Sequence, residues 1–152
     1  MTQHQAPGQG RASREGLRTA STSLSREARL AAGILASRRR REDLFGANLF
    51  ADPAWDMLLD LFVEEEKGNS VYVSSLCMAS AVPTTTALRW IGTLTEAGLF
   101  ERRPTGSNRK IEIFLSRRAR ALVRQHLNET LDEVLRPSPD DEDPREMPRS
   151  RS

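Results

Sequence analysis

Apolar residues recur with a helical period in the first third of the chain. They follow one another at intervals of four, three and four residues, on one side of a helix: Leu24, Ala28, Ala31 and Leu35. We therefore predict a first helix over 24–44. The four arginines at 38–41 suit the negative end of its dipole, and contact with DNA or a partner is the alternative interpretation.

A second helix is marked at both ends by residues with strong positional preferences. Asp52 can accept an N-cap hydrogen bond, and Pro53 suits the first helical position, where its missing N–H has no intrahelical partner. Gly68-Asn69 ends the helix. Its predicted inward face is Trp55, Leu58, Leu59, Phe62 and Val63, and its acids, interpreted as a solvated face, are Asp56, Asp60, Glu64, Glu65 and Glu66.

A short strand and two helices follow in close succession. The β-branched and aromatic residues of 71–73 predict a strand, and Ser74 can cap a helix of one or two turns. Ala81-Val82 turns the chain, and Pro83 opens a helix over 83–97 that Gly98 terminates.

The pattern then changes to that of a hairpin and a final helix. Leu99-Phe100 begins a strand, and the polar segment 104–108 has the chemistry of a tip. The returning strand alternates at Ile111, Ile113 and Leu115. Ser116 can cap a helix over 117–135 with an apolar stripe of Ala119, Leu122, Val123, His126, Leu127, Thr130, Leu131 and Val134.

This order of elements predicts a mainly α fold with a small β-hairpin wing, a winged helix-turn-helix flanked by N- and C-terminal helices. One domain over 23–135 is expected, since the chain has 152 residues. Residues 1–22 form a predicted disordered basic tail, and 136–152 a disordered tail rich in proline and acids, because neither has periodic apolar positions.

Composition narrows the class of protein. No apolar run approaches the roughly 20 residues that cross a bilayer, and the first 22 residues lack the apolar core of a secretory signal. Cys77 is the only cysteine, so we expect a reducing, cytoplasmic location and a buried thiol. No metal-ligand spacing, nucleophile motif or phosphate loop is found. We therefore expect no enzyme, no catalytic residue, no metal and no cofactor.

The helix over 83–97 is the candidate for reading DNA. Ala87, Ile91 and Leu94 would point inward, which leaves a polar outer face of Thr84, Thr85, Thr86, Arg89, Trp90 and Thr93. The first turns of such a helix reach base edges in the major groove. The alternative is an ordinary amphipathic helix, although an outer tryptophan without a partner argues against it.

The wing is the second candidate for DNA contact. Its predicted contact residues flank the tip: Arg102, Arg103, Asn108, Arg109 and Lys110. Cations on a hairpin can clamp phosphates or enter a narrow minor groove, and Arg109 is the first choice for that position. The alternative is a solvated turn whose charges protect an exposed edge. Net charge is only +2, so a cationic face depends on local clustering.

Residues 54–120 resemble the winged helix-turn-helix of MarR-type transcriptional regulators. The resemblance lies in segments 76–79, 84–91, 94–102 and 109–116, with Glu-Ala-Gly-Leu at 96–99 as its most specific part. The family's Asp-x-Arg wing motif has Ser107 in place of the aspartate and Arg109 in place of the arginine. Its Leu-Thr-x-x-Gly after the wing is replaced by Leu115-Ser116-Arg117-Arg118-Ala119.

The resemblance implies binding to double-stranded DNA as a homodimer, through helices 24–44 and 117–135. Family members have two helices after the wing, and this chain has room for one. A small-molecule effector is compatible with the resemblance, but no residue pattern supports one. We expect half-sites about 34 Å apart, with the wing 104–110 beside the major-groove helix. The alternative function is a protein–protein interaction module that does not bind DNA.

Overall fold

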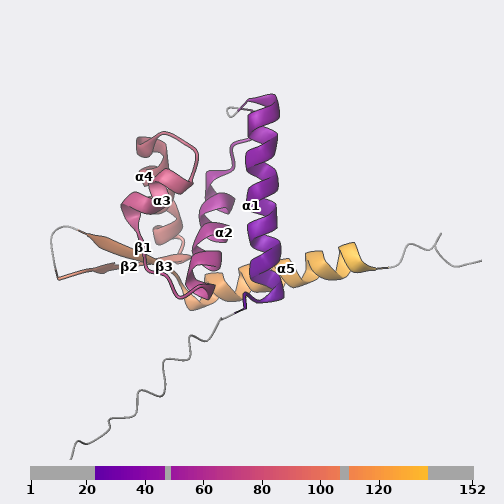
Figure 1. The fold of residues 1–152 in the computed structure, drawn as a ribbon. Helices are drawn as coiled ribbons and strands as arrows, with labels where there is room; N and C mark the ends of the chain where they lie inside the picture. The colour runs from indigo at the N-terminus through magenta and orange to yellow at the C-terminus, as the bar shows by residue number, and fades with distance from the viewer. Residues whose placement is uncertain (1–22, 47–48, 107–109, 137–152) are drawn as a thin grey trace, which may run out of the picture.

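The structure is a computed structural model that describes residues 23–46, 49–106 and 110–136. Within these residues five helices and three strands follow one another along the chain (Figure 1): α1 (Arg26–Phe45), α2 (Pro53–Glu66), β1 (Val71–Tyr72), α3 (Val73–Ala79), α4 (Thr84–Glu96), β2 (Phe100–Pro104), β3 (Ile111–Leu115) and α5 (Arg117–Leu135). The strands form one antiparallel sheet in the order β1-β3-β2. The predicted winged helix-turn-helix is confirmed.

Most helix boundaries lie where the capping residues predict them. The carboxylate of Asp52 accepts from the Trp55 N–H at 3.3 Å, and the Ser116 hydroxyl accepts from the Ala119 N–H at 3.0 Å. Gly98 follows α4 with a φ of 69°, a conformation that favours glycine. These local signals set where α2 and α5 begin and where α4 ends.

The predicted start of α3 is wrong. Val73 is helical and Tyr72 precedes the helix, so Ser74 does not cap it. The strand is correspondingly short, because β1 pairs with β3 only through Val71 and Tyr72.

Helix α2 lies at the centre of the molecule and packs against α1, α3, α4, α5 and the sheet. Met57, Leu59, Leu61 and Phe62 are its most deeply buried side chains. Two residues that the sequence places on the inward face, Trp55 and Leu58, are only half-buried. A helix that is covered on several sides buries more than one stripe, and a single-stripe pattern cannot show which residues lie at the edge.

The wing extends the sheet beyond the core. Opposed residues of an antiparallel pair share a face, so Phe100 and Leu115 lie on the core side together with Arg102 and Ile113. Ile111, which alternates in phase with them, is exposed because the hairpin has by then passed the edge of the core.

Helix α5 begins below α2 and runs past the N-terminal end of α1 (Figure 1). Its first half is anchored by Ala119, Val123 and Leu127, which are buried against the domain. Val134 near its end is 75% exposed, and Leu135 beside it is also exposed. The final part of α5 therefore presents apolar side chains that the domain itself does not cover. None of the helices in the described residues combines the length and apolarity that a membrane span requires.

Candidate nucleic-acid interface

The outer face of α4 is arranged as the sequence predicts. Ala87, Ile91 and Leu94 are buried and fix which side of the helix faces the core. Of the predicted outer residues, Thr86 is half-buried and the others are exposed: Thr84, Thr85, Arg89, Trp90 and Thr93. Arg89, Trp90, Thr93 and the half-buried Thr86 line one hollow, whereas Thr84 lines the groove between α3, α4 and β3.

A shallow hollow of about 190 Å³ lies on this surface, lined by Thr86, Arg89, Trp90 and Thr93. The Thr93 hydroxyl donates to the carbonyl of Arg89 at 3.1 Å, so its remaining capacity toward a ligand is as an acceptor. Trp90 is 38% exposed and belongs to the rim of this hollow. A large aromatic on an outer helix face is available for contact with a partner.

The described part of the wing carries three of the five predicted contact residues. Arg102, Arg103 and Lys110 are exposed, whereas Asn108 and Arg109 lie outside the described residues. The base of the tip is closed by Thr105, whose N–H and hydroxyl both donate to the carbonyl of Lys110, at 3.1 and 2.8 Å.

These three cations are divided between the two faces of the sheet. Arg102 is opposite Ile113 and therefore lies on the same face of the sheet as Phe100 and Leu115, which pack on the core. On the opposite face the Arg103 guanidinium lies 4.8 Å from the ring centroid of Phe114, and the Lys110 ammonium 5.5 Å from that of Tyr72. Stacking on a ring restrains the stem while the charge remains accessible. Successive residues of a strand lie on opposite faces, so the separation of Arg102 from Arg103 follows from the strand itself. The ring partners Phe114 and Tyr72 depend on the strand pairing, which the sequence does not give.

Two arginines of α5 close to the wing in sequence do not add free charge to this cationic surface. Arg120 and Arg124 form ion pairs with Glu65 and Glu66 of α2. The prediction that the α2 acids form a solvated face is therefore wrong. Asp56 also contradicts it, since this side chain is 9% exposed and pairs with Arg38 at 2.5 Å.

The arginine run of α1 does not lie at the end of the helix. The helix continues to Phe45, so the cations at 38–41 are not in its last turn, and the dipole interpretation is wrong. The guanidinium of Arg41 lies 4.5 Å from the ring centroid of Phe50, while Arg39 and Arg40 are exposed.

A groove between α3, α4 and β3 is a feature that the sequence does not predict. It has a volume of about 470 Å³, and its walls include Met78, Leu88 and Ile111. All three are exposed, Met78 to 84%. In the sequence, the one indication of this groove is Met78 on the outer side of a short helix. The other walls, Leu88 and Ile111, come from segments that only the tertiary fold brings next to it.

The structure describes the cysteine and one of the two histidines, for which the sequence predicts no catalytic or metal-binding function. Cys77 is buried, and burial raises the pKa of its thiol, which disfavours the reactive thiolate. The ring of His126 meets that of Trp55 edge to face, with centroids 5.1 Å apart. Across the described ranges no group of three or more His, Cys, Asp or Glu side chains could hold a metal ion.

Comparisons with known proteins find similarity at the level of structure. No family model matches the sequence, and a search of curated proteins finds no match. The chain is similar to AF1382 from Archaeoglobus fulgidus, with 22% identity and a TM-score of 0.48 over 64% of this chain and 99% of that one. It is similar to S. aureus MepR in its DNA-binding conformation, with 14% identity and a TM-score of 0.46 over 70% and 77% of the two chains. NadR in complex with 4-hydroxyphenylacetate shares 19% identity and a TM-score of 0.45 over 85% and 81%.

Proposed function

We propose that this protein is a transcriptional regulator that binds specific sequences in double-stranded DNA. Helix α4 would enter the major groove, and the wing 104–110 would contact the neighbouring minor groove or the backbone. The observation that carries the proposal is the exposed outer face of α4, with its threonines, Arg89 and Trp90, next to a wing whose described cations are also exposed. The resemblance of residues 54–120 to MarR-type regulators supports the same function.

Base readout would depend on α4. The guanidinium of Arg89 can bond O6 and N7 of a guanine together, a contact worth about 1–3 kcal/mol of discrimination. Threonine methyl groups can pack on a thymine methyl, and threonine hydroxyls can bond a phosphate or a base. Thr84 and Thr85 are in the first turn of α4, where the helix dipole favours a negatively charged phosphate.

The wing would supply contacts that do not read sequence. Arg102 on one face of the hairpin and Arg103 with Lys110 on the other could engage phosphates on both sides of a groove. We assign Arg109 and Asn108 to the tip contact on the basis of the sequence alone.

We further propose that the protein is a homodimer formed through α1 and α5. The observation in favour is the exposed apolar end of α5, at Val134 and Leu135. Two-fold symmetry implies two half-sites, which we expect about 34 Å apart, one turn of DNA. We expect V134E to dissociate the dimer in sedimentation velocity experiments, whereas N128E on an exposed position of the same helix leaves it intact. Equal behaviour of the two variants would contradict this interface.

A protein–protein interaction module is the second candidate function. The groove that contains Met78, Leu88 and Ile111 favours it, because an exposed apolar hollow suits a side chain of a partner better than a phosphate. Leu88 lines this groove and not the hollow around Arg89. A change at Leu88 should therefore affect binding of a protein partner in the groove and not base readout by Arg89.

Fluorescence anisotropy on random genomic fragments at two salt concentrations tests the proposal. A DNA reader shows a steep fall in affinity with salt, and sequencing of the bound fragments then gives the operator. We expect R89A to relax preference at one base pair, whereas R103A should weaken binding to all sequences alike. Absence of salt-dependent binding by the wild type would refute DNA binding. Equal losses on every sequence with R89A would refute its assigned part in base readout.

A further inference from the structure

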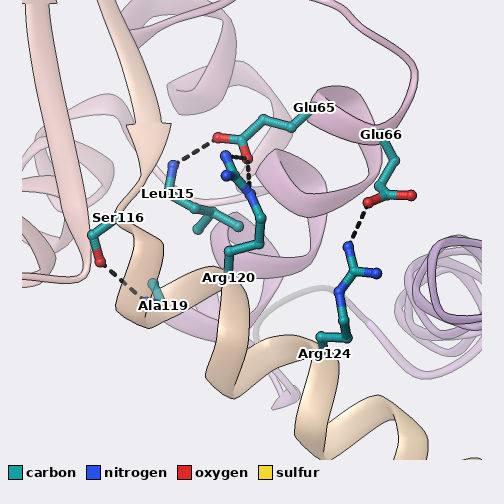
Figure 2. Close-up of polar contacts among 7 residues, drawn as sticks. All are labelled: Glu65, Glu66, Leu115, Ser116, Ala119, Arg120 and Arg124. Atoms are coloured by element: carbon teal, nitrogen blue, oxygen red, sulfur yellow. Dashed lines mark hydrogen bonds and ion pairs between the residues drawn. The ribbon is translucent and has the colours of Figure 1, made fainter.

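One carboxylate near the end of α2 joins three parts of the molecule. The side chain of Glu65 accepts from the Leu115 N–H at 2.7 Å through one oxygen, and from the Arg120 guanidinium through the other (Figure 2). Leu115 is the last residue of β3, and Arg120 lies in the first turns of α5. Glu65 is 13% exposed, so these partners largely replace water around it.

The Leu115 N–H has this acceptor because β1 is too short to supply one. The register of β1 with β3 would place Asn69 opposite Leu115 if it continued by two residues. Asn69 instead belongs to the turn after α2, where its N–H donates to the carbonyl of Glu64 at 2.9 Å. Glu65 therefore completes the edge of β3 at the point where β1 does not reach it. A buried backbone N–H requires such an acceptor.

Only one residue separates the wing from α5 at this point. The Ser116 N–H donates to the carbonyl of Leu99 at 2.9 Å, and its hydroxyl caps α5 (Figure 2). The end of the hairpin and the start of α5 are thus fixed to each other, and Glu65 holds both of them to α2.

A second ion pair lies further along the same two helices but does not involve the sheet. Arg124 donates to Glu66 at 2.7 Å (Figure 2). Both side chains are more exposed to solvent than Glu65. The Arg124 guanidinium also lies 5.5 Å from the ring centroid of Phe62, again in α2, so this pair joins α2 to α5 without contacting the sheet. It therefore provides a matched control, with the same residue types on the same elements and no contact with β3.

We propose that Glu65 is a positioning residue that sets the angle between the wing and α5 through Leu115 and Arg120. The consequence rests on the proposed function. If α5 holds the partner subunit and α4 with the wing reads DNA, this angle determines how far apart the two reading helices lie. Glu65 and Arg120 then select the spacing between half-sites without touching DNA.

Spacing preference tests the consequence for DNA. We define spacing preference as the affinity for the operator with the best half-site spacing, divided by the affinity for an operator in which the same half-sites are one base pair further apart. We expect R120M to lower this ratio by up to about fivefold, the factor that corresponds to about 1 kcal/mol for a partly exposed ion pair. R120K should restore most of the ratio, and R124M should leave it unchanged. The half-site sequence preferred by R120M should remain that of the wild type. Equal ratios in R120M and the wild type would overturn the proposal, as would equal loss in R124M.

A distance measurement tests the angle without DNA. Spin labels are placed on the exposed positions Glu101 and Asn128, in a C77A background and with excess unlabelled protein so that only distances within one chain are seen. We expect E65A and R120M to shift or broaden the distance distribution between the wing and α5, and R124M to leave it unchanged. Unchanged distributions in both E65A and R120M would overturn the proposal even if the protein binds DNA. A changed distribution with no salt-dependent DNA binding by the wild type would leave the angle assignment standing and refute the proposed function.

Discussion

Three arginines of α1 and α5 have different surroundings from the arginines of α4 and the described part of the wing. Arg38, Arg120 and Arg124 each pair with a carboxylate of α2. Arg89, Arg102 and Arg103 form no ion pair with any carboxylate among the described residues. Arginine thus provides three internal links to α2, whereas the described arginines of α4 and the wing all remain accessible charges.

The position of α2 explains the difference. This helix packs against α1 and α5, and its carboxylates neutralise one cation of α1 and two of α5, Arg38, Arg120 and Arg124. The other exposed arginines of these helices include Arg39, Arg40, Arg117 and Arg118. The wing projects beyond the core, away from these acids (Figure 1). A nearly neutral protein can therefore keep a local positive field on α4 and the wing, which is the field that a phosphate backbone senses.

The largest expected effect of breaking an internal link is at Asp56. The Arg38 and Asp56 side chains are both mostly buried, and D56A leaves the guanidinium without its closest partner. Removal of one member of a buried pair costs about 3–5 kcal/mol. We expect a loss of free energy of unfolding of that size for D56A, measured by urea denaturation.

The control for Asp56 is Asp52, whose carboxylate lies 3.9 Å from Arg38 and is half-exposed. D52N retains an N-cap acceptor for α2, and we expect a change within about 0.5 kcal/mol. If D56A is as mild as D52N, then the Arg38 pair does not link α1 to α2, and the contrast between the two sets of arginines weakens.

The next effect concerns the accessible cations of the wing. Each arginine that contacts a phosphate contributes about 0.9 to the slope of log affinity against log salt. We expect the double variant R102A/R103A to reduce this slope by up to about 2, with little change in stability. R117A/R118A removes two exposed arginines at the start of α5 and serves as the charge-matched control. An equal reduction of the slope in both variants would mean that net charge, rather than the wing, determines the binding.

Local patterns predicted the elements that present the candidate interface. The spacing of Ala87, Ile91 and Leu94 was sufficient to identify the outer face of α4, because a helix has a fixed period. Polar tip residues and alternation likewise placed the hairpin. The caps at Asp52 and Ser116 depend on neighbours within three residues, so they too could be read from the sequence.

Which acids of α2 form ion pairs could not be predicted from local patterns. Glu65 lies 50 residues from Leu115 and 55 from Arg120 in the sequence, and nothing local distinguishes it from Asp60 or Glu64. Which acid is paired depends on where β3 and α5 cross α2. The groove beside Met78 was missed for the same reason, since its walls come from three separate elements.

The smallest expected effect is at Asp60, the α2 acid that has no ion-pair partner among the described residues. Burial raises the pKa of its carboxyl above the ordinary value of 3.8, and the negative charge of Glu64 adds to the effect. Because the folded-state pKa is the higher one, the folded state binds more protons between the two values, and stability falls as pH rises through that window. D60N should therefore raise the free energy of unfolding at neutral pH, by about 0.5 kcal/mol, and should flatten the pH dependence in the acidic range. Urea denaturation at several pH values from acidic to neutral measures both. A loss of stability in D60N at neutral pH would show that Asp60, like the other acids of α2, is stabilised by a neighbouring cation, and would remove the distinction between it and Asp56.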